Sequence, residues 1–294
     1  MRFKEGESYP RFCRAPQTEN DLYPPTVNED WDQKLTDETS LQPLLHGEEV
    51  YLDVPALACN KSYLATGAIA VSPNQKYVAY SLDETGGETA QMYVKHIESG
   101  QEWVLHQNAT DVLDCDGSVV WNDESNALYY VLMDEKQRSY QLYRRQIFDS
   151  DWQWIDIESQ EEGDELLLEE SDELFNLRIN KSFDRKYLIA KCSSKEASEV
   201  HYLDLCSDQN ELLCIAKRQP KVLYRVTHCQ GYWLVQTNIG GLPNLSMKAC
   251  PVGTEGMEKW KDVVSIDSGA PMPVFDGGHK RSLDVSEISY FVSL

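Results

Sequence analysis

The chain has 294 residues, of which 41% are hydrophobic and 10% aromatic, so it can bury a substantial core as one large domain or two small ones. Its formal net charge of −22 argues against nucleic acid and anionic membrane surfaces as partners, and it favours cationic ligands such as basic peptides. An acidic, solvated surface with no specific partner is the simpler interpretation of the same charge.

The cysteines predict neither a structural metal site nor a disulfide framework. No two of them have C-x-x-C spacing, and no histidine stands at zinc-ligand spacing from such a pair. The first residues lack the apolar core of a signal peptide, and no apolar run approaches the ~18 residues of a membrane span. We therefore expect reduced thiols in a cytoplasmic protein without cofactors or metals. The eight cysteines are Cys13, Cys59, Cys115, Cys192, Cys206, Cys214, Cys229 and Cys250.

Residues 17–47 differ from the rest of the chain. They are rich in Asp, Glu and Pro and keep no sustained period, which indicates an acidic surface insertion between two strands. A plain loop is the simpler interpretation, and a docking segment anchored by Leu22, Tyr23 and Trp31 is the more specific functional alternative.

A short strand over residues 48–54 and a turn over residues 55–58 precede a unit that occurs four times. Each unit alternates β-branched or aromatic residues with polar ones and places Asn, Asp, Gly or Ser at the bends. Residues 166–168, which acidic segments flank, are also predicted to form a strand rather than a helix. The strands predicted in the four units are 69–72, 76–82, 92–97 and 103–105; 118–121, 127–133 and 140–145; 174–179, 186–192, 199–205 and 212–216; and 224–228, 232–237 and 244–250.

A strand-only unit that recurs every ~40–60 residues is typical of propeller blades. One four-stranded sheet cannot bury both of its faces, so such sheets stack on one another around an axis. The sequence therefore predicts an all-β fold, a partial β-propeller of four-stranded antiparallel blades, with four units and an incomplete first one.

No motif for catalysis or cofactor binding accompanies the repeat. The sequence contains no G-x-S-x-G nucleophile elbow, P-loop, G-x-G-x-x-G or H-E-x-x-H. His96 and His201 are expected at matching strand positions of two repeats, where ordinary strand residues are a simpler interpretation than triad members. We predict no catalytic, cofactor-binding or metal-ligating residue in this chain.

Two glycine pairs and one arginine cluster have both a structural and a functional interpretation. Gly86–Gly87 and Gly240–Gly241 suit turns that need positive φ, and a phosphate cradle is the weaker alternative because no helix start follows either pair. Arg138, Arg144 and Arg145 are expected to pair with neighbouring carboxylates in so acidic a protein. The functional alternative for these arginines is a site that binds a peptide carboxylate.

Several segments together resemble the propeller domain of the prolyl oligopeptidase family of serine peptidases, and within that family oligopeptidase B. The similarity covers about residues 4–250 in register and fades after about Trp260. Each segment is weakly specific alone, but their order and spacing make the set specific. The segments are Glu5–Pro10 with Cys13–Arg14, Glu48–Asp53 with Leu57–Ala58, Leu64–Gly67, Val71–Pro73, Ala79–Asp83 with Gly87–Glu88, Val120–Trp121, Arg138–Arg144, Glu169–Phe175, Ser193–Lys195 and Ser198–Val200.

The resemblance implies a lid rather than a catalytic domain. Complete members of the family cleave short peptides with a Ser-Asp-His triad on a C-terminal α/β-hydrolase domain, and the propeller restricts access to it. Members of the oligopeptidase B type cut after Arg or Lys. The triad lies outside the propeller, so the resemblance assigns no catalytic residue to this chain. Of the family's seven blades, residues 1–264 would supply about four to five, with residues 265–294 as a divergent tail or an incomplete blade.

Two functions follow from these expectations. The chain is either the substrate-gating portion of an oligopeptidase B-like peptidase, inactive alone, or a free-standing propeller that binds a protein or peptide. The first predicts short basic peptides and an α/β-hydrolase domain, or another chain that completes the ring, as partners. A partial ring leaves unpaired sheet edges that promote aggregation, which favours the first function. Neither function involves nucleic acid or a membrane.

Overall fold

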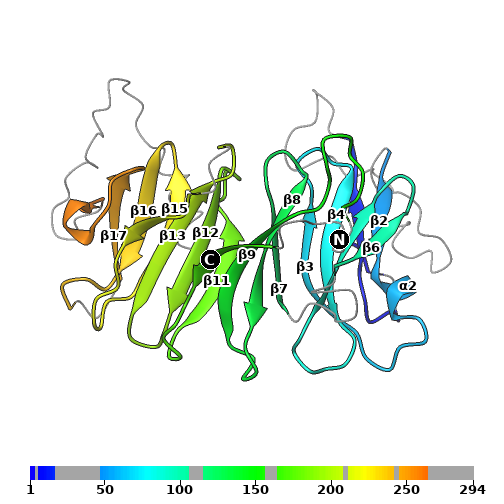
Figure 1. The fold of residues 1–294 in the computed structure, drawn as a ribbon, viewed down its shortest axis with the longest axis horizontal. Helices are drawn as coiled ribbons and strands as arrows, with labels where there is room; N and C mark the ends of the chain where they lie inside the picture. Colours follow the sequence, from blue (N-terminus) through cyan, green and yellow to red (C-terminus); the bar gives the residue numbers. More distant parts are fainter. Residues whose placement is uncertain are drawn as a thin grey trace. The chain divides into compact units, whose positions relative to one another are not determined.

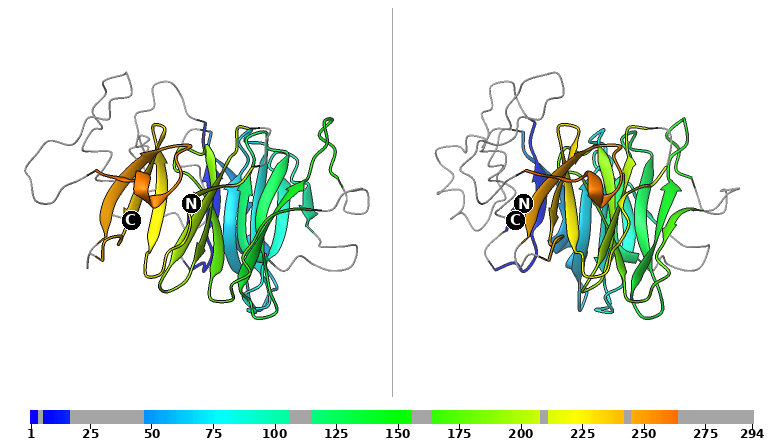
Figure 2. Two further views of the ribbon diagram at one scale, coloured as in Figure 1. Left: turned by 60° about the vertical axis from the view of Figure 1, so that its left-hand side comes forward. Right: turned by 90° about the vertical axis from the view of Figure 1, so that its left-hand side faces the viewer.

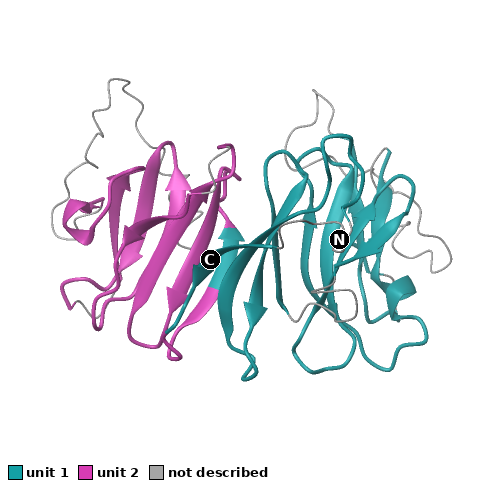
Figure 3. Ribbon diagram, in the orientation of Figure 1, with its two compact units in different colours: residues 1–171, 178–180 teal, residues 172–177, 181–294 magenta. Residues whose placement is uncertain are grey.

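The computed structural model describes residues 1–3, 6–16, 47–105, 115–155, 164–207, 211–241 and 245–263. They belong to two compact units, which we describe separately: residues 1–171 with 178–180, and residues 172–177 with 181–294 (Figure 3). The acidic insertion, apart from Gly47, and the tail over 265–294 lie outside the described residues. Within those ranges, no helix has the length and apolar character needed to cross a bilayer.

Unit 1 contains one two-stranded and two four-stranded antiparallel sheets (Figure 1). Their strands are β1 (Arg11–Arg14) and β2 (Glu49–Asp53); β3 (Ala65–Val71), β4 (Tyr77–Asp83), β5 (Gln91–His96) and β6 (Glu102–Val104); and β7 (Cys115–Trp121), β8 (Ala127–Met133), β9 (Ser139–Gln146) and β10 (Glu165–Glu169). Each four-stranded sheet is a simple meander in which strands that follow one another in the chain are paired.

Unit 2 contains two further four-stranded antiparallel meanders, drawn in yellow-green to orange in Figure 2. The first includes β11, of which residues 178–180 group with unit 1. The strands are β11 (Asn176–Lys181), β12 (Tyr187–Ser193), β13 (Ser198–Asp204) and β14 (Leu213–Ala216); and β15 (Tyr224–Cys229), β16 (Tyr232–Thr237), β17 (Ser246–Pro251) and β18 (Lys261–Asp262). A 3₁₀ turn, η2 (Met257–Lys259), precedes β18.

The predicted all-β architecture of four-stranded antiparallel sheets is confirmed, as is the incomplete first sheet. Every strand predicted in the four units is present, with ends that differ by a few residues, and β10 confirms the strand predicted at 166–168. The sequence did not predict β18, because two residues are too few to show alternation.

The turn predicted over residues 55–58 is wrong, because a one-turn helix, α2 (Val54–Ala58), forms there. The Asp53 carboxylate caps this helix by accepting a hydrogen bond from the Ala56 N–H at 3.1 Å. Pro55 lies in the first turn, where its missing N–H has no intrahelical partner to lose. Val54 is fully buried, so the helix also anchors the end of β2.

The repeated sequence unit begins with a repeated turn. In the first four-stranded sheet the Ser72 hydroxyl donates to Asn74 Oδ1 at 2.7 Å and accepts from the Tyr77 N–H at 3.0 Å. In the third, Ser182 makes the same bonds to Asp184 and Tyr187, at 2.7 and 3.0 Å. This Ser-x-Asn/Asp-x-Lys-Tyr turn therefore fixes where the second strand of these two sheets starts.

Neighbouring sheets of unit 1 pack face to face through buried side chains. The core between β3–β6 and β7–β10 is built around Trp121, whose indole N–H donates to the Ala70 carbonyl at 2.8 Å. Tyr77 and Phe148 lie in the same core with ring centroids 4.5 Å apart. A second core joins the β1–β2 sheet to β3–β6. Its buried members are Leu52, Val54, Leu64, Val78, Tyr80 and Leu82.

Unit 2 repeats this arrangement between its two sheets. Trp233 is fully buried, and its ring lies 5.2 Å from Tyr187 and 4.9 Å from Tyr202. The hydroxyl of Ser198 donates to the Tyr224 carbonyl at 2.9 Å, so a polar bond also crosses from one sheet to the next. Alternating side chains of each strand thus supply the contacts that the repeat predicts.

Candidate functional site

The histidines of the described residues do not form a hydrolytic triad. His96 contacts Ser99, at 2.9 Å, but both lie in one turn and no carboxylate bonds to this ring in the part of the chain that is described. The buried His228 contacts Asp184 at 2.6 Å, and its second nitrogen accepts from the Gly231 N–H at 3.1 Å. Both nitrogens of this ring are therefore engaged: one links two sheets of unit 2, and the other holds the turn between β15 and β16.

The expectation that His96 and His201 occupy matching positions is wrong. His96 lies opposite Tyr77, the tyrosine of the repeated turn, whereas the residue opposite the equivalent Tyr187 is Asp204. His201 comes three residues before Asp204. The loops between the second and third strands differ in length in the two sheets. Spacing along the sequence therefore does not place His96 and His201 at equivalent positions.

The predicted pairing of the arginine cluster with carboxylates is confirmed. The pairs are Arg138–Asp134 at 2.9 Å, Arg145–Asp164 at 2.6 Å and Arg144–Glu165 at 3.9 Å. The Arg145 side chain is 5% exposed, and although burial opposes its charge, the bonds to Asp164 raise its pKa. These cations are held by the protein's own carboxylates, which argues against a peptide-carboxylate site here.

The glycine pairs lie in turns, as predicted, and Gly86, Gly240 and Gly241 have positive φ. Gly87 does not. The N–H groups of Gly86 and Glu88 donate to the Asp83 carboxylate at 2.8 and 3.0 Å. Because a carboxylate of the same loop already accepts these bonds, the Gly86–Gly87 turn is not a phosphate cradle.

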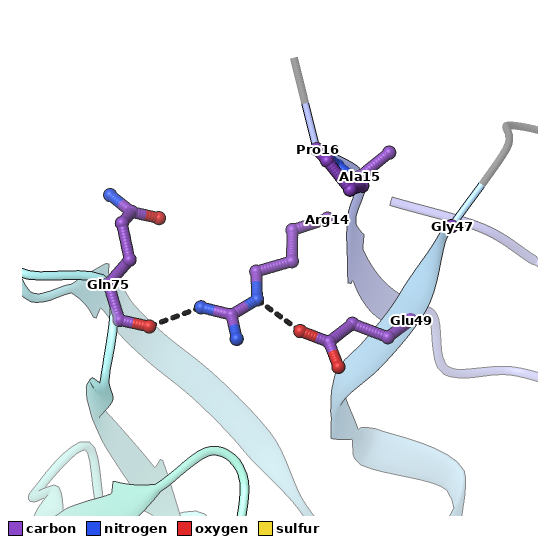
Figure 4. Close-up of a pocket in the computed structure, with 6 residues that line it drawn as sticks. All are labelled: Arg14, Ala15, Pro16, Gly47, Glu49 and Gln75. Carbon is purple, nitrogen blue, oxygen red and sulfur yellow. Dashed lines mark hydrogen bonds and ion pairs between the residues drawn. The ribbon is translucent and has the colours of Figure 1, made fainter. Parts of the chain in front are cut away.

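An open pocket of about 720 Å³ lies beside β1 and β2 in unit 1 (Figure 4). Among the described residues that line it, the one cationic side chain is Arg14, which donates to the Glu49 carboxylate at 2.6 Å and to the carbonyl of Gln75. The remaining lining residues are Ala15, Pro16 and Gly47. The ion pair with Glu49 neutralises the guanidinium and links β1 to β2, and the bond to Gln75 links β1 to the repeated turn, so this arrangement is structural.

One group of side chains has the composition of a metal site. Glu199 and His201 in β13 and Cys214 in β14 place a carboxylate oxygen, an imidazole nitrogen and a sulfur within 4.8 Å of one another. Glu199 Oε1 and His201 Nε2 are 2.9 Å apart. Our prediction weighed only C-x-x-C spacing, so it did not consider this group, which two paired strands bring together.

The hydrogen bond between Glu199 and His201 predicts that part of the folding stability is lost in acid. The hydrogen bond from His201 lowers the pKa of Glu199 to about 2 from 4.5, against the opposing effect of burial. Its contribution to folding is therefore complete above pH 4.5 and disappears as the pH falls towards 2. With metal chelated, Glu199→Gln should lower the free energy of unfolding most at neutral pH. Urea titrations should show the difference from the parent shrinking across that acid range.

The exposed Glu196→Gln in the adjoining loop is the matched control for this prediction. It removes the same charge without the His201 bond and should follow the parent at every pH. A Glu199→Gln difference that stays constant from neutral pH down to pH 2 would contradict the assigned role of the carboxylate.

Comparison with known proteins places this architecture in a family. Residues 3–277 match the family described as "Prolyl oligopeptidase, N-terminal beta-propeller domain". The chain is 32% identical over 205 residues to Protease 2 of Moraxella lacunata, covering 70% of this chain and 28% of that protein. It is 26% identical over 219 residues to dipeptidyl aminopeptidase BI of Pseudoxanthomonas mexicana, covering 74% and 28%.

Solved structures give the same result. Oligopeptidase B from Leishmania major has a TM-score of 0.61 at 28% identity, over 73% of this chain and 29% of that one. Oligopeptidase B from Trypanosoma brucei, in a closed form with covalently bound antipain, has a TM-score of 0.63 at 25% identity, over 90% and 33%. The chain spans about a third or less of the relatives it matches. It belongs to the prolyl oligopeptidase family, and corresponds to the N-terminal β-propeller domain of that family.

Proposed function

We propose that this chain is the substrate-gating propeller portion of an oligopeptidase B-like serine peptidase and has no peptidase activity by itself. The observation that carries the proposal is the family match over residues 3–277, in a sequence without a G-x-S-x-G elbow. The whole enzyme would act on short peptides, cutting after Arg or Lys. We retain residues 1–264 as the partial propeller and 265–294 as a divergent tail.

The contacts inside unit 1 suit a rigid wall around a passage. The first strands of its four-stranded sheets, β3 and β7, lie against each other, and two side-chain hydrogen bonds join β7 to β3 and to the neighbouring β4. The Trp121 indole donates to the Ala70 carbonyl at 2.8 Å, and the Ser81 hydroxyl donates to the Gly117 carbonyl at 2.7 Å. Hydrogen-bonded polar contacts of this kind hold one arrangement, which a size filter needs.

The charge of the chain supports a preference for basic peptides. A net charge of −22 raises the local concentration of cationic ligands by long-range attraction. We propose such peptides as substrates of the complete enzyme, with an α/β-hydrolase domain, or a chain that completes the ring, as the partner of this propeller. The eight cysteines of the described residues carry thiols rather than disulfides, and on that basis we propose a cytoplasmic location.

Activity is tested on the purified 294-residue chain with arginyl and lysyl peptide-amide reporters. We expect no turnover above a buffer blank, because the residues that would form the triad are not in this sequence. Turnover that survives a trypsin-contamination control and disappears with a serine-directed phosphonate would contradict the proposal.

The genomic reading frame after the codon for Leu294 separates the proposal from a free-standing binding propeller. If the proposal is right, a frame that encodes G-x-S-x-G follows within roughly a few hundred codons, because that is the usual size of such a domain. If no such frame follows, the gating function is wrong and a peptide- or protein-binding propeller takes its place.

A further inference from the structure

Three potential metal ligands lie on one face of the sheet that contains β13 and β14. Glu199 and His201 are two residues apart in β13, so both side chains point to the same side. Cys214 lies directly opposite His201 in the β13–β14 pairing. The register shifts between Val200 and His201, so a local irregularity brings Cys214 beside His201, as bulges near functional sites do.

We propose that Glu199, His201 and Cys214 bind a thiophilic divalent metal ion of the zinc class. Their ligand atoms already lie within 4.8 Å of one another, and all three residues are only partly buried, so an ion can reach them. Zinc bonds of about 2.0–2.3 Å to S, N and O would require only small rotations of these side chains. A thiolate and an imidazole select zinc over magnesium or calcium, and water completes the tetrahedron.

The surroundings orient the carboxylate for this task. The backbone N–H of Arg218 donates to Glu199 Oε2 at 2.9 Å, which leaves Oε1 directed at His201. The Arg218 guanidinium approaches the same Oε2, at 3.7 Å, and stacks over the Phe175 ring at 4.0 Å. The Arg218 cation is thus held at Oε2, and Oε1 remains available to the metal. Residues outside the ligand set commonly orient metal ligands in this way.

Charge and protonation also fit a divalent ion. A carboxylate and a thiolate together balance its two positive charges, with His201 as a neutral ligand. Zinc binds a cysteine as the thiolate, so binding should release about one proton per ion, from Cys214.

The test uses the whole chain, stripped with chelator and kept reduced, with Zn²⁺ and Co²⁺ as probes. Zn²⁺ titrated by calorimetry in two buffers of different ionisation enthalpy should bind at one site and release about one proton. Co²⁺ should give a thiolate charge-transfer band and the visible absorption of tetrahedral cobalt. Absence of either cobalt signal, or of proton release, would overturn the site.

Variants assign the site to these residues. Cys214→Ser should weaken Zn²⁺ binding at least about 100-fold and abolish the charge-transfer band, since even outer-shell changes cost 10–100-fold. Cys59→Ser removes an exposed thiol in unit 1 and should bind as the parent does. Glu199→Gln should also weaken Zn²⁺ binding but keep the charge-transfer band, which separates ligand loss from misfolding. Zn²⁺ affinity unchanged in Cys214→Ser would refute the proposal.

Discussion

Trp121→Ala is expected to lower the free energy of unfolding by about 3–5 kcal/mol, in the range of large-to-small core substitutions. The Trp121 side chain is 2% exposed and fills the core between the β3–β6 and β7–β10 sheets. Its removal opens a cavity there and leaves the Ala70 carbonyl without the indole N–H. Both losses act on the contact between two sheets, so the substitution should loosen the wall of the proposed gate.

Urea unfolding followed by far-ultraviolet circular dichroism measures this loss. Trp121→Phe should cost clearly less, because an aromatic ring still fills most of the space and only the hydrogen bond disappears. Phe3→Ala is the control, since Phe3 is 57% exposed in the same unit and should change stability by no more than about 0.5 kcal/mol. If Trp121→Ala costs no more than Phe3→Ala, the inter-sheet core is not where unit 1 gains its stability.

The repeat could be predicted from the sequence because its signals are local. Alternation marks the strands, and the Ser-x-Asn/Asp-x-Lys-Tyr turns at Ser72 and Ser182 mark where β4 and β12 start. Pairing in a meander then follows from chain order. The sequence predicts a turn where α2 forms because the helix cap, Asp53, is also the last residue of a strand, and a residue type cannot show which role dominates.

The metal-ligand group could not be predicted in the same way. Glu199 and His201 share a face by strand alternation alone, but Cys214 joins them only through a register that includes an irregularity. Register depends on which residues become buried, not on spacing. A search for a Glu-x-His pair in one strand with a cysteine in the next would have raised this group as a candidate. It would not have distinguished Cys214 from Cys206, which lies in the intervening turn region.

Gly67→Ala is expected to destabilise the protein by about 2–4 kcal/mol, the combined range of overpacking and a displaced buried hydroxyl. Gly67 in β3 and Gly117 in β7 both lie where the strand register is irregular, and the two backbones approach closely. A Cβ on Gly67 would overlap the Ser81 hydroxyl and stand 3.2 Å from the Gly117 carbonyl oxygen. Ser81 is fully buried and donates to that carbonyl at 2.7 Å, so it has no room to move.

A double-mutant cycle tests this mechanism directly. Ser81→Ala in the Gly67→Ala background removes the atom that the new methyl meets first, so the double variant should be less destabilised than the sum of the singles, by about 1–2 kcal/mol. Gly100→Ala is the control: Gly100 has a φ of 73° but no atom within 4 Å of an added Cβ. It should cost only about 1 kcal/mol of backbone strain. A Gly67→Ala cost no larger than that, or additive singles, would mean that β3 and β7 can separate, and the junction could not serve as a rigid edge of a substrate gate.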